Sequence, residues 1–164
     1  QFDPDAIVVS SFSKYFSMTG WRLGWLVAPP ALRAPLTHIG QNITIAAPTL
    51  SQLAAVAAFD SHEECEANIA RYARNRSVLL EGLPLAGLDR LAPADGAFYI
   101  WACTDHIADD SQALCSRWLD EIDLAATPGI DFDPEHGHRY VRFSFAGSEA
   151  DVAEAVRRLR DWNP

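Results

Sequence analysis

One stretch of sequence decides how this chain is interpreted: Ser11-Phe12-Ser13-Lys14-Tyr15-Phe16-Ser17-Met18-Thr19-Gly20-Trp21-Arg22-Leu23-Gly24. Lys14 is the only lysine among the 164 residues, and it follows the apolar run of residues 6–9. That run predicts a buried strand, and an amine held at its end is partly desolvated, which leaves its lone pair free to attack an aldehyde. Ser11, Ser13 and Arg22 add two hydroxyls and a guanidinium fork, which are groups that bind phosphate. The sequence therefore predicts a site for a molecule that carries both an aldehyde and a phosphate.

Pyridoxal phosphate is such a molecule. The stretch resembles the lysine signature of class I/II aminotransferases, which are fold type I pyridoxal-phosphate enzymes, in its Ser-x-Ser-Lys followed by Gly-x-Arg-x-Gly. The resemblance implies that Lys14 forms the Schiff base, that Arg22 and Ser11 bind the phosphate, and that Ser13 is a further cofactor-binding candidate. It also implies the fold class: an α/β chain that is the carboxy-terminal part of a fold type I large domain, followed by an α+β small domain. The alternative is a strand–turn–strand that holds a lysine and an arginine by chance.

A second candidate residue lies on the predicted strand at residues 139–146. Val141, Phe143 and Phe145 alternate along this strand and predict its buried face, so Arg142 must project from the other face. The segment Val-Arg-Phe-Ser-Phe-Ala is similar to the carboxy-terminal motif of the same family. By that resemblance Arg142 binds the α-carboxylate of the substrate through two parallel hydrogen bonds. An exposed strand arginine without a ligand is the alternative.

The resemblance implies an enzyme that transfers an amino group from an amino acid to a 2-oxo acid, with the Lys14 amine as general base and acid. Two alternatives stay open. The same lysine and arginines also serve lyases, decarboxylases and cyclopropane-forming synthases of this fold. A non-catalytic module descended from the fold would need none of them.

The chain begins close to the lysine strand, and no residue can be matched to the family's glycine-rich loop or to its ring-binding aspartate. We therefore expect a fragment of a longer protein that is inactive alone. The resembling enzymes place an uncharged stretch like residues 41–48 near a neighbouring subunit's active site, which favours a homodimer. A plain connecting loop explains the stretch equally well.

Composition excludes several other classes of function. The formal net charge is −9, which argues against nucleic-acid binding, and no apolar run reaches the ~20 residues that span a bilayer. Three widely spaced cysteines favour reduced thiols and a cytoplasmic location. His136 and His138 have no third ligand at diagnostic spacing, so we expect no metal.

Hydrophobic periodicity and turn residues predict the elements. Strands are expected at residues 6–10, 20–27, 96–101, 124–126 and 139–146, and helices at 31–39, 49–59 and 61–83, with two more that Ser111 and Ser148 cap. A capping box is expected at Ser61, and Leu50, Leu53, Ala54 and Ala57 should form the apolar face of the second helix. The domains then follow as a remnant of the cofactor-binding large domain (1–60), a long connecting helix (61–83) and a small α+β domain (84–164).

Overall fold

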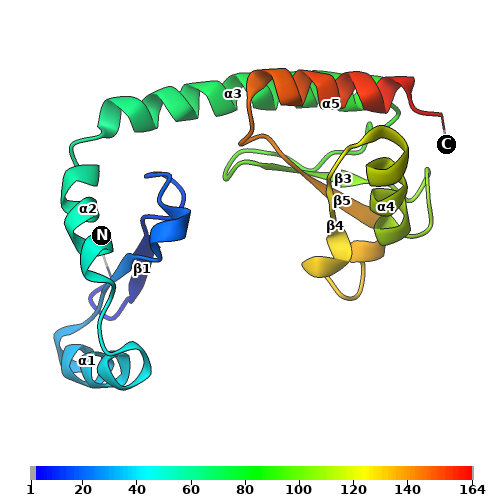
Figure 1. Ribbon diagram of the computed structural model, residues 1–164. Coiled ribbons are helices and arrows are strands. Elements are labelled where there is room, and N and C mark those ends of the chain that lie inside the picture. The colour runs from blue at the N-terminus through cyan, green and yellow to red at the C-terminus, as the bar shows by residue number, and fades with distance from the viewer. Residues whose placement is uncertain (1–2, 164) are drawn as a thin grey trace. The chain divides into compact units, whose positions relative to one another are not determined.

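The computed structural model of the protein describes residues 3–163. Its contacts divide the chain into two compact units, residues 1–67 and 68–164. The boundary falls within the long helix α3 (His62–Leu85) (Figure 1). None of the helices in the described part of the chain combines the length and the apolar character needed to cross a membrane.

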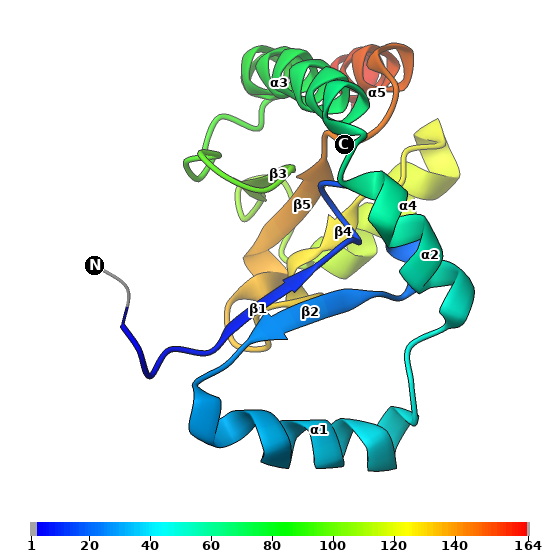
Figure 2. The same ribbon diagram turned by 90° about the vertical axis from the view of Figure 1, so that its left-hand side faces the viewer.

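The first unit is built on an antiparallel hairpin of β1 (Val8–Ser11) and β2 (Gly24–Val27), which lie side by side in Figure 2. The register pairs Ser11 with Gly24. A Cβ at residue 24 would lie 2.6 Å from the carbonyl oxygen of Ser10, so only glycine allows the strands to approach this closely. The predicted strand at residues 20–27 begins late because a 3-10 helix, η1 (Thr19–Trp21), and a left-handed Arg22 come first.

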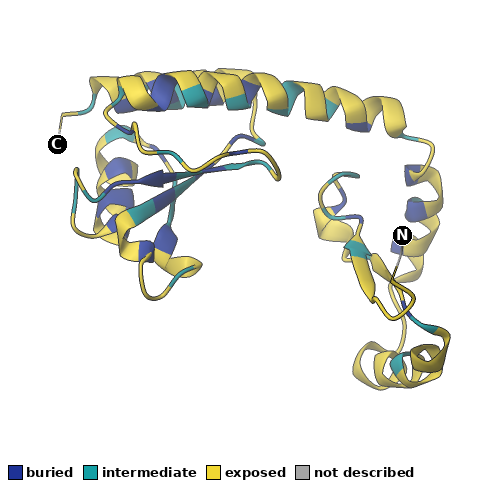
Figure 3. Ribbon diagram, turned by 180° about the vertical axis from the view of Figure 1, so that it is seen from behind, coloured by how far each residue is buried: buried dark blue, intermediate teal, exposed yellow. Residues whose placement is uncertain are grey.

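The prediction that the first strand is buried is wrong for this chain. Val9 is 77% exposed, and Figure 3 colours both strands of the hairpin as mostly exposed. The small core of this unit lies at the lysine loop instead, where Phe12 and Met18 pack against Ala55 and Ala58. Two strands alone do not bury both faces of a sheet, because burial needs a covering layer that these residues do not supply.

Two helices follow the hairpin. Helix α1 (Pro30–Thr44) is longer than predicted, so the expected loop at residues 41–48 is shorter. Three polar side chains along α1 donate to carbonyl oxygens four residues earlier: Thr37 to Arg33 at 2.8 Å, Asn42 to His38 at 2.7 Å and Thr44 to Gly40 at 3.0 Å.

Helix α2 (Thr49–Ala58) buries a face that the sequence analysis did not choose. Ser51, Ala55 and Ala58 are buried, whereas Leu50 and Leu53 are exposed, so the predicted apolar face is wrong. The Ser51 hydroxyl donates to the Trp21 carbonyl oxygen at 2.6 Å. Small side chains allow α2 to lie close to the lysine loop.

The second unit contains a three-stranded antiparallel sheet in the order β3-β5-β4, formed by β3 (Tyr99–Cys103), β4 (Thr127–Pro128) and β5 (Tyr140–Ser144). Helices α4 (Ser111–Ile122) and α5 (Glu149–Asp161) and the second part of α3 complete it. Its core is large and gathers the following buried side chains: Leu79, Leu83, Leu88, Ile100, Leu114, Trp118, Leu124, Val141, Phe143, Phe145, Val152, Val156 and Leu159.

Several local predictions for this unit are confirmed. Val141, Phe143 and Phe145 are buried, and the Ser148 hydroxyl accepts a hydrogen bond from the Asp151 amide at 3.1 Å at the start of α5. The predicted strands at 96–101 and 124–126 are shifted, because Tyr99–Cys103 and Thr127–Pro128 are the residues that pair with β5.

Two predicted caps are wrong. Asp110, and not Ser111, caps α4 by accepting from the Gln112 amide at 2.8 Å, while the buried Ser111 hydroxyl donates to Gly137. The Ser61 hydroxyl donates to the Ala57 carbonyl oxygen at 3.4 Å instead of forming a capping box. In both cases the serine hydroxyl donates to a backbone carbonyl oxygen outside the helix that it was predicted to cap.

Candidate active site

Lys14 lies in a loop whose two ends are anchored in the core of the first unit. Phe12 and Met18 are buried, and the Met18 amide donates to the Phe12 carbonyl oxygen at 3.1 Å. Within the loop, the Ser17 amide donates to the Lys14 carbonyl oxygen at 3.0 Å, and Ser17 has a φ of 54°. The backbone around the lysine is therefore a closed turn whose buried ends hold it in place.

The residues predicted to bind phosphate lie together. Ser11, Ser13 and Arg22 line one cavity of about 450 Å³ beside the β1–β2 hairpin. Thr19 connects them, because its hydroxyl donates to the Ser13 carbonyl oxygen at 2.6 Å and its own carbonyl oxygen accepts from Nη1 of Arg22 at 2.9 Å. Thr19 was not singled out from the sequence, although it stands inside the lysine stretch.

The backbone of Arg22 supports a special role for this position. Its φ of 52° is unusual for a residue with a side chain, and such strain gathers at ligand-binding positions. Ser10, Ser11, Ser13 and Arg22 line the same cavity, and Gly24 leaves its wall without a Cβ. This donor set fits a phosphate group.

Lys14 is adjacent in sequence to Ser13 but does not line this cavity itself. Its side chain is exposed, so the predicted desolvation at the end of a buried strand does not occur in this chain. The cause is the one given for the hairpin: among residues 3–163, no second layer covers the strands. The first unit therefore brings Ser11, Ser13 and Arg22 to one cavity, and Lys14 is next to Ser13 in the chain but outside that cavity.

Tyr15 joins the lysine loop to the start of α3, a contact that the sequence analysis missed. Its hydroxyl donates to Oε1 of Glu66 at 2.9 Å and lies 3.1 Å from Nδ1 of His62. The hydrogen bond to the Glu66 carboxylate raises the pKa of Tyr15, and burial adds to the increase. No local pattern could reveal this contact, because 51 residues separate Tyr15 from Glu66.

Arg142 lies in the second unit, in the central strand β5. It pairs in register with Trp101 on one side and Thr127 on the other, and it projects from the face opposite the core as predicted. Its guanidinium carbon lies 4.0 Å from the centroid of the Tyr99 ring and 4.0 Å from that of Phe132. Its Nε is buried and has no hydrogen-bond partner among the described residues. A guanidinium is a charged donor that suits an anion such as a carboxylate.

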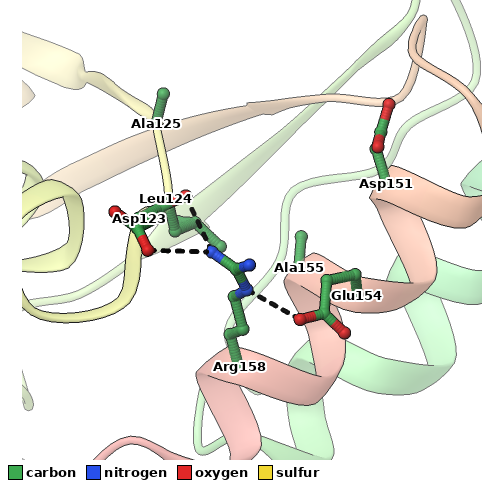
Figure 4. Close-up of a pocket in the computed structure, with 7 residues that line it drawn as sticks. All are labelled: Asp123, Leu124, Ala125, Asp151, Glu154, Ala155 and Arg158. Atoms are coloured by element: carbon green, nitrogen blue, oxygen red, sulfur yellow. Dashed lines mark hydrogen bonds and ion pairs between the residues drawn. The ribbon is translucent and has the colours of Figure 1, made fainter.

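A cavity of about 340 Å³ elsewhere in the second unit does not share this chemistry (Figure 4). Arg158 is its one basic side chain, and it already donates to Oε1 of Glu154 at 2.8 Å and to the carbonyl oxygen of Ile122 at 2.7 Å. Within residues 3–163, no group of three or more His, Cys, Asp and Glu side chains could hold a metal ion.

Comparisons with known proteins agree with these observations. The family described as "Aminotransferase class I and II" matches residues 2–159. The chain is 51% identical over its whole length to a valine–pyruvate aminotransferase of Mycobacterium tuberculosis, of which it covers 43%. It is 32% identical over 98% of its length to an aspartate aminotransferase of Sulfurisphaera tokodaii, of which it covers 42%.

The fold is shared as well. The crystal structure of an aminotransferase from Mycobacterium tuberculosis superposes with a TM-score of 0.94 at 51% identity, covering 98% of this chain and 42% of that one. The predicted fold class is thereby confirmed, and the chain spans less than half the length of these relatives. It belongs to the class I and II aminotransferase family.

Proposed function

We propose that this chain carries the lysine and the phosphate- and carboxylate-binding residues of a pyridoxal-phosphate-dependent aminotransferase. The enzyme would transfer an amino group from an amino acid to a 2-oxo acid. The observation that carries this proposal is the shared cavity of Ser11, Ser13 and Arg22 beside the loop of Lys14. Membership of the aminotransferase family supports it.

Each residue has a distinct chemical task in this proposal. Arg22 and the hydroxyls of Ser11 and Ser13 bind the phosphate, as charge-assisted and neutral donors respectively. When bound, pyridoxal phosphate supplies an aldehyde and a ring that withdraws electrons. Lys14 would hold the aldehyde end of the cofactor, and its amine would act as general base and acid toward the proton of the substrate Cα. Arg142 orients the substrate through its α-carboxylate, so that the Cα–H bond is held in a reactive direction.

The attachment residue is directly testable, because this chain contains a single lysine. The full-length protein is incubated with pyridoxal phosphate, reduced with borohydride to make an imine permanent, and digested for peptide mass spectrometry. We expect the label on Lys14 and complete loss of both the label and the visible absorbance in Lys14→Ala. His38→Ala, an exposed change in α1, is the matched control and should keep both. A label on another residue of the wild-type protein would refute the assignment.

Three further features are proposed for the whole protein. Helix α3 connects a cofactor-binding domain to a small α+β domain, which the position of the boundary between the two units supports. A cytoplasmic location is supported by three buried cysteines, none in a disulfide. Exposed isoleucines at positions 39, 43 and 45 of α1 and its C-terminal end support a homodimer, which sedimentation of the full-length protein would check.

A further inference from the structure

The guanidinium of Arg142 lies between two aromatic rings. Its central carbon is 4.0 Å from each ring centroid, and the two rings come from different segments of the second unit. Tyr99 is the first residue of β3, the strand next to β5, and Phe132 follows the 3-10 helix η2 (Gly129–Asp131). Cations prefer the faces of aromatic rings, so each ring attracts the guanidinium from its own side.

The loop that carries Phe132 is held in one conformation by short contacts. A Cβ on Gly137 would lie 2.4 Å from the carbonyl carbon of Gly129, so the two glycines bring the ends of the loop together. The Phe132 amide donates to the Gly129 carbonyl oxygen at 2.9 Å, and the buried Ser111 hydroxyl donates to that of Gly137 at 3.0 Å. Asp133 accepts hydrogen bonds from two amides further along the loop. The position of Phe132 is therefore determined by its backbone and does not depend on core burial.

Phe132 is not a core residue, because it is 51% exposed. Besides Arg142 it contacts Trp101, edge to face, at 6.0 Å between ring centroids. Trp101 in turn stacks on Tyr140 at 5.5 Å. The contact of Phe132 with Arg142 therefore lies outside the buried core of the second unit.

We propose that Tyr99 and Phe132 are positioning residues that hold the Arg142 guanidinium by its two faces. Both faces are then covered, and the N–H groups remain available only at the edge, in the plane where a carboxylate is bound by two parallel hydrogen bonds. Because the fork is already immobile before the substrate arrives, less side-chain entropy is lost on binding. The inference rests on the proposed function, since it assigns the carboxylate to Arg142.

The test compares ring removal with ring retention in the full-length protein. Phe132→Leu keeps an apolar side chain but loses the aromatic face, and Phe132→Tyr keeps the face. We expect Phe132→Leu to raise the KM for the amino acid by about 5–10-fold, the cost of ordering one long side chain, with kcat changed less than about twofold. Phe132→Tyr should stay within about twofold of the wild type in both constants.

A binding measurement separates this inference from the proposed function. Binding of 3-methylbutanoate, which has a carboxylate but no amine, is measured by calorimetry. Phe132→Leu should raise its Kd by the same factor as the KM, about 5–10-fold. Arg142→Lys should raise the Kd by a larger factor. If Arg142→Lys weakens binding but Phe132→Leu and Phe132→Tyr behave alike, the positioning role is overturned and the function stands. If the wild-type protein shows neither turnover nor carboxylate binding that depends on Arg142, both are overturned. Melting curves confirm folding, and Phe132→Met replaces Phe132→Leu if the latter unfolds.

Discussion

At the scale of single residues, the carboxylate of Asp105 pairs with arginines next to the sheet that carries Arg142. Arg139, the residue before β5, donates to Oδ2 of Asp105 from Nε at 3.1 Å and also from Nη2. Arg90 pairs with the other oxygen, and Nδ1 of His106 lies 3.8 Å from it. The Arg139 hydrogen bond is the largest cause that lowers the pKa of Asp105 from 3.8 to about 2, against a smaller opposing effect of burial.

This pKa predicts how stability depends on pH. A carboxylate whose pKa is lower in the folded state than in the unfolded state stabilises the fold fully above about pH 4, and the effect is lost as the pH falls through about 2. We expect the free energy of unfolding to differ between wild type and Asp105→Asn by a constant amount above about pH 5, and the difference to shrink toward pH 2. Urea titrations across this pH range check it.

The matched control is Asp109→Asn, an exposed aspartate of the same loop without an ion pair among residues 3–163. Its difference from wild type should depend on pH much less. The prediction is contradicted if the difference in unfolding free energy between wild type and Asp105→Asn stays constant down to about pH 2. The lowered pKa of Asp105 would then not be the cause of the loss of stability in acid.

At the scale of elements, helices α3 and α5 pack closely enough to require glycine at their crossing. Figure 1 shows the two helices alongside each other, and a Cβ on Gly82 would lie 2.4 Å from Cγ1 of Val156. Gly82 stands inside α3, where alanine would otherwise be favoured by about 1 kcal/mol. The close contact therefore outweighs helix propensity at this position.

We expect Gly82→Ala to lower the free energy of unfolding by about 1–2 kcal/mol, because overpacking costs about 1–3 kcal/mol and exceeds the gain in propensity. Val156→Ala removes the two methyl groups that would clash. The double variant should consequently lose less than the sum of the two single variants. Denaturant unfolding of the four proteins measures this coupling.

Gly40→Ala in α1 is the control for propensity alone, since nothing lies within 4 Å of a Cβ there. Gly40→Ala should raise the free energy of unfolding, whereas Gly82→Ala should lower it. Additive effects of the Gly82 and Val156 substitutions would mean that the two positions do not compete for space.

At the scale of the whole molecule, the two units differ in how much apolar surface they bury. Among the described residues, the core of the second unit joins two strands of the sheet, β3 and β5, and three helices, whereas that of the first unit contains only Phe12, Met18, Ala55 and Ala58. Local opening is governed by such buried contacts, so the two units should differ in local stability.

Hydrogen exchange of the 164-residue chain measures that difference. We expect amides of β3, β5 and α4 to exchange at least about 10-fold more slowly than those of β1, β2 and α1. Within the first unit, the amides of Phe12 and Met18 should be the most protected, because they donate to backbone carbonyl oxygens beside the small core. Equal protection in both units would contradict the inferred difference.

Some features of this protein follow from local sequence alone. The alternation around Arg142 determines its face, because side chains of a strand point to opposite sides with a period of two residues. Ser148 caps α5 because a serine hydroxyl reaches an amide three residues away without help from the rest of the fold. The lysine stretch likewise contains its hydroxyls and its arginine within a dozen residues.

Other features depend on tertiary structure. The buried face of α2 could not be chosen from its sequence, because apolar residues surround the helix and only the lysine loop selects Ser51, Ala55 and Ala58. The burial of the first strand depends on a covering layer, and the contact of Tyr15 with Glu66 joins residues 51 positions apart. The aromatic faces around Arg142 also required the fold, since a loop closed by two glycines determines where Phe132 lies. Periodicity therefore determines which way a side chain points, but what it contacts depends on segments that the chain brings together only when it folds.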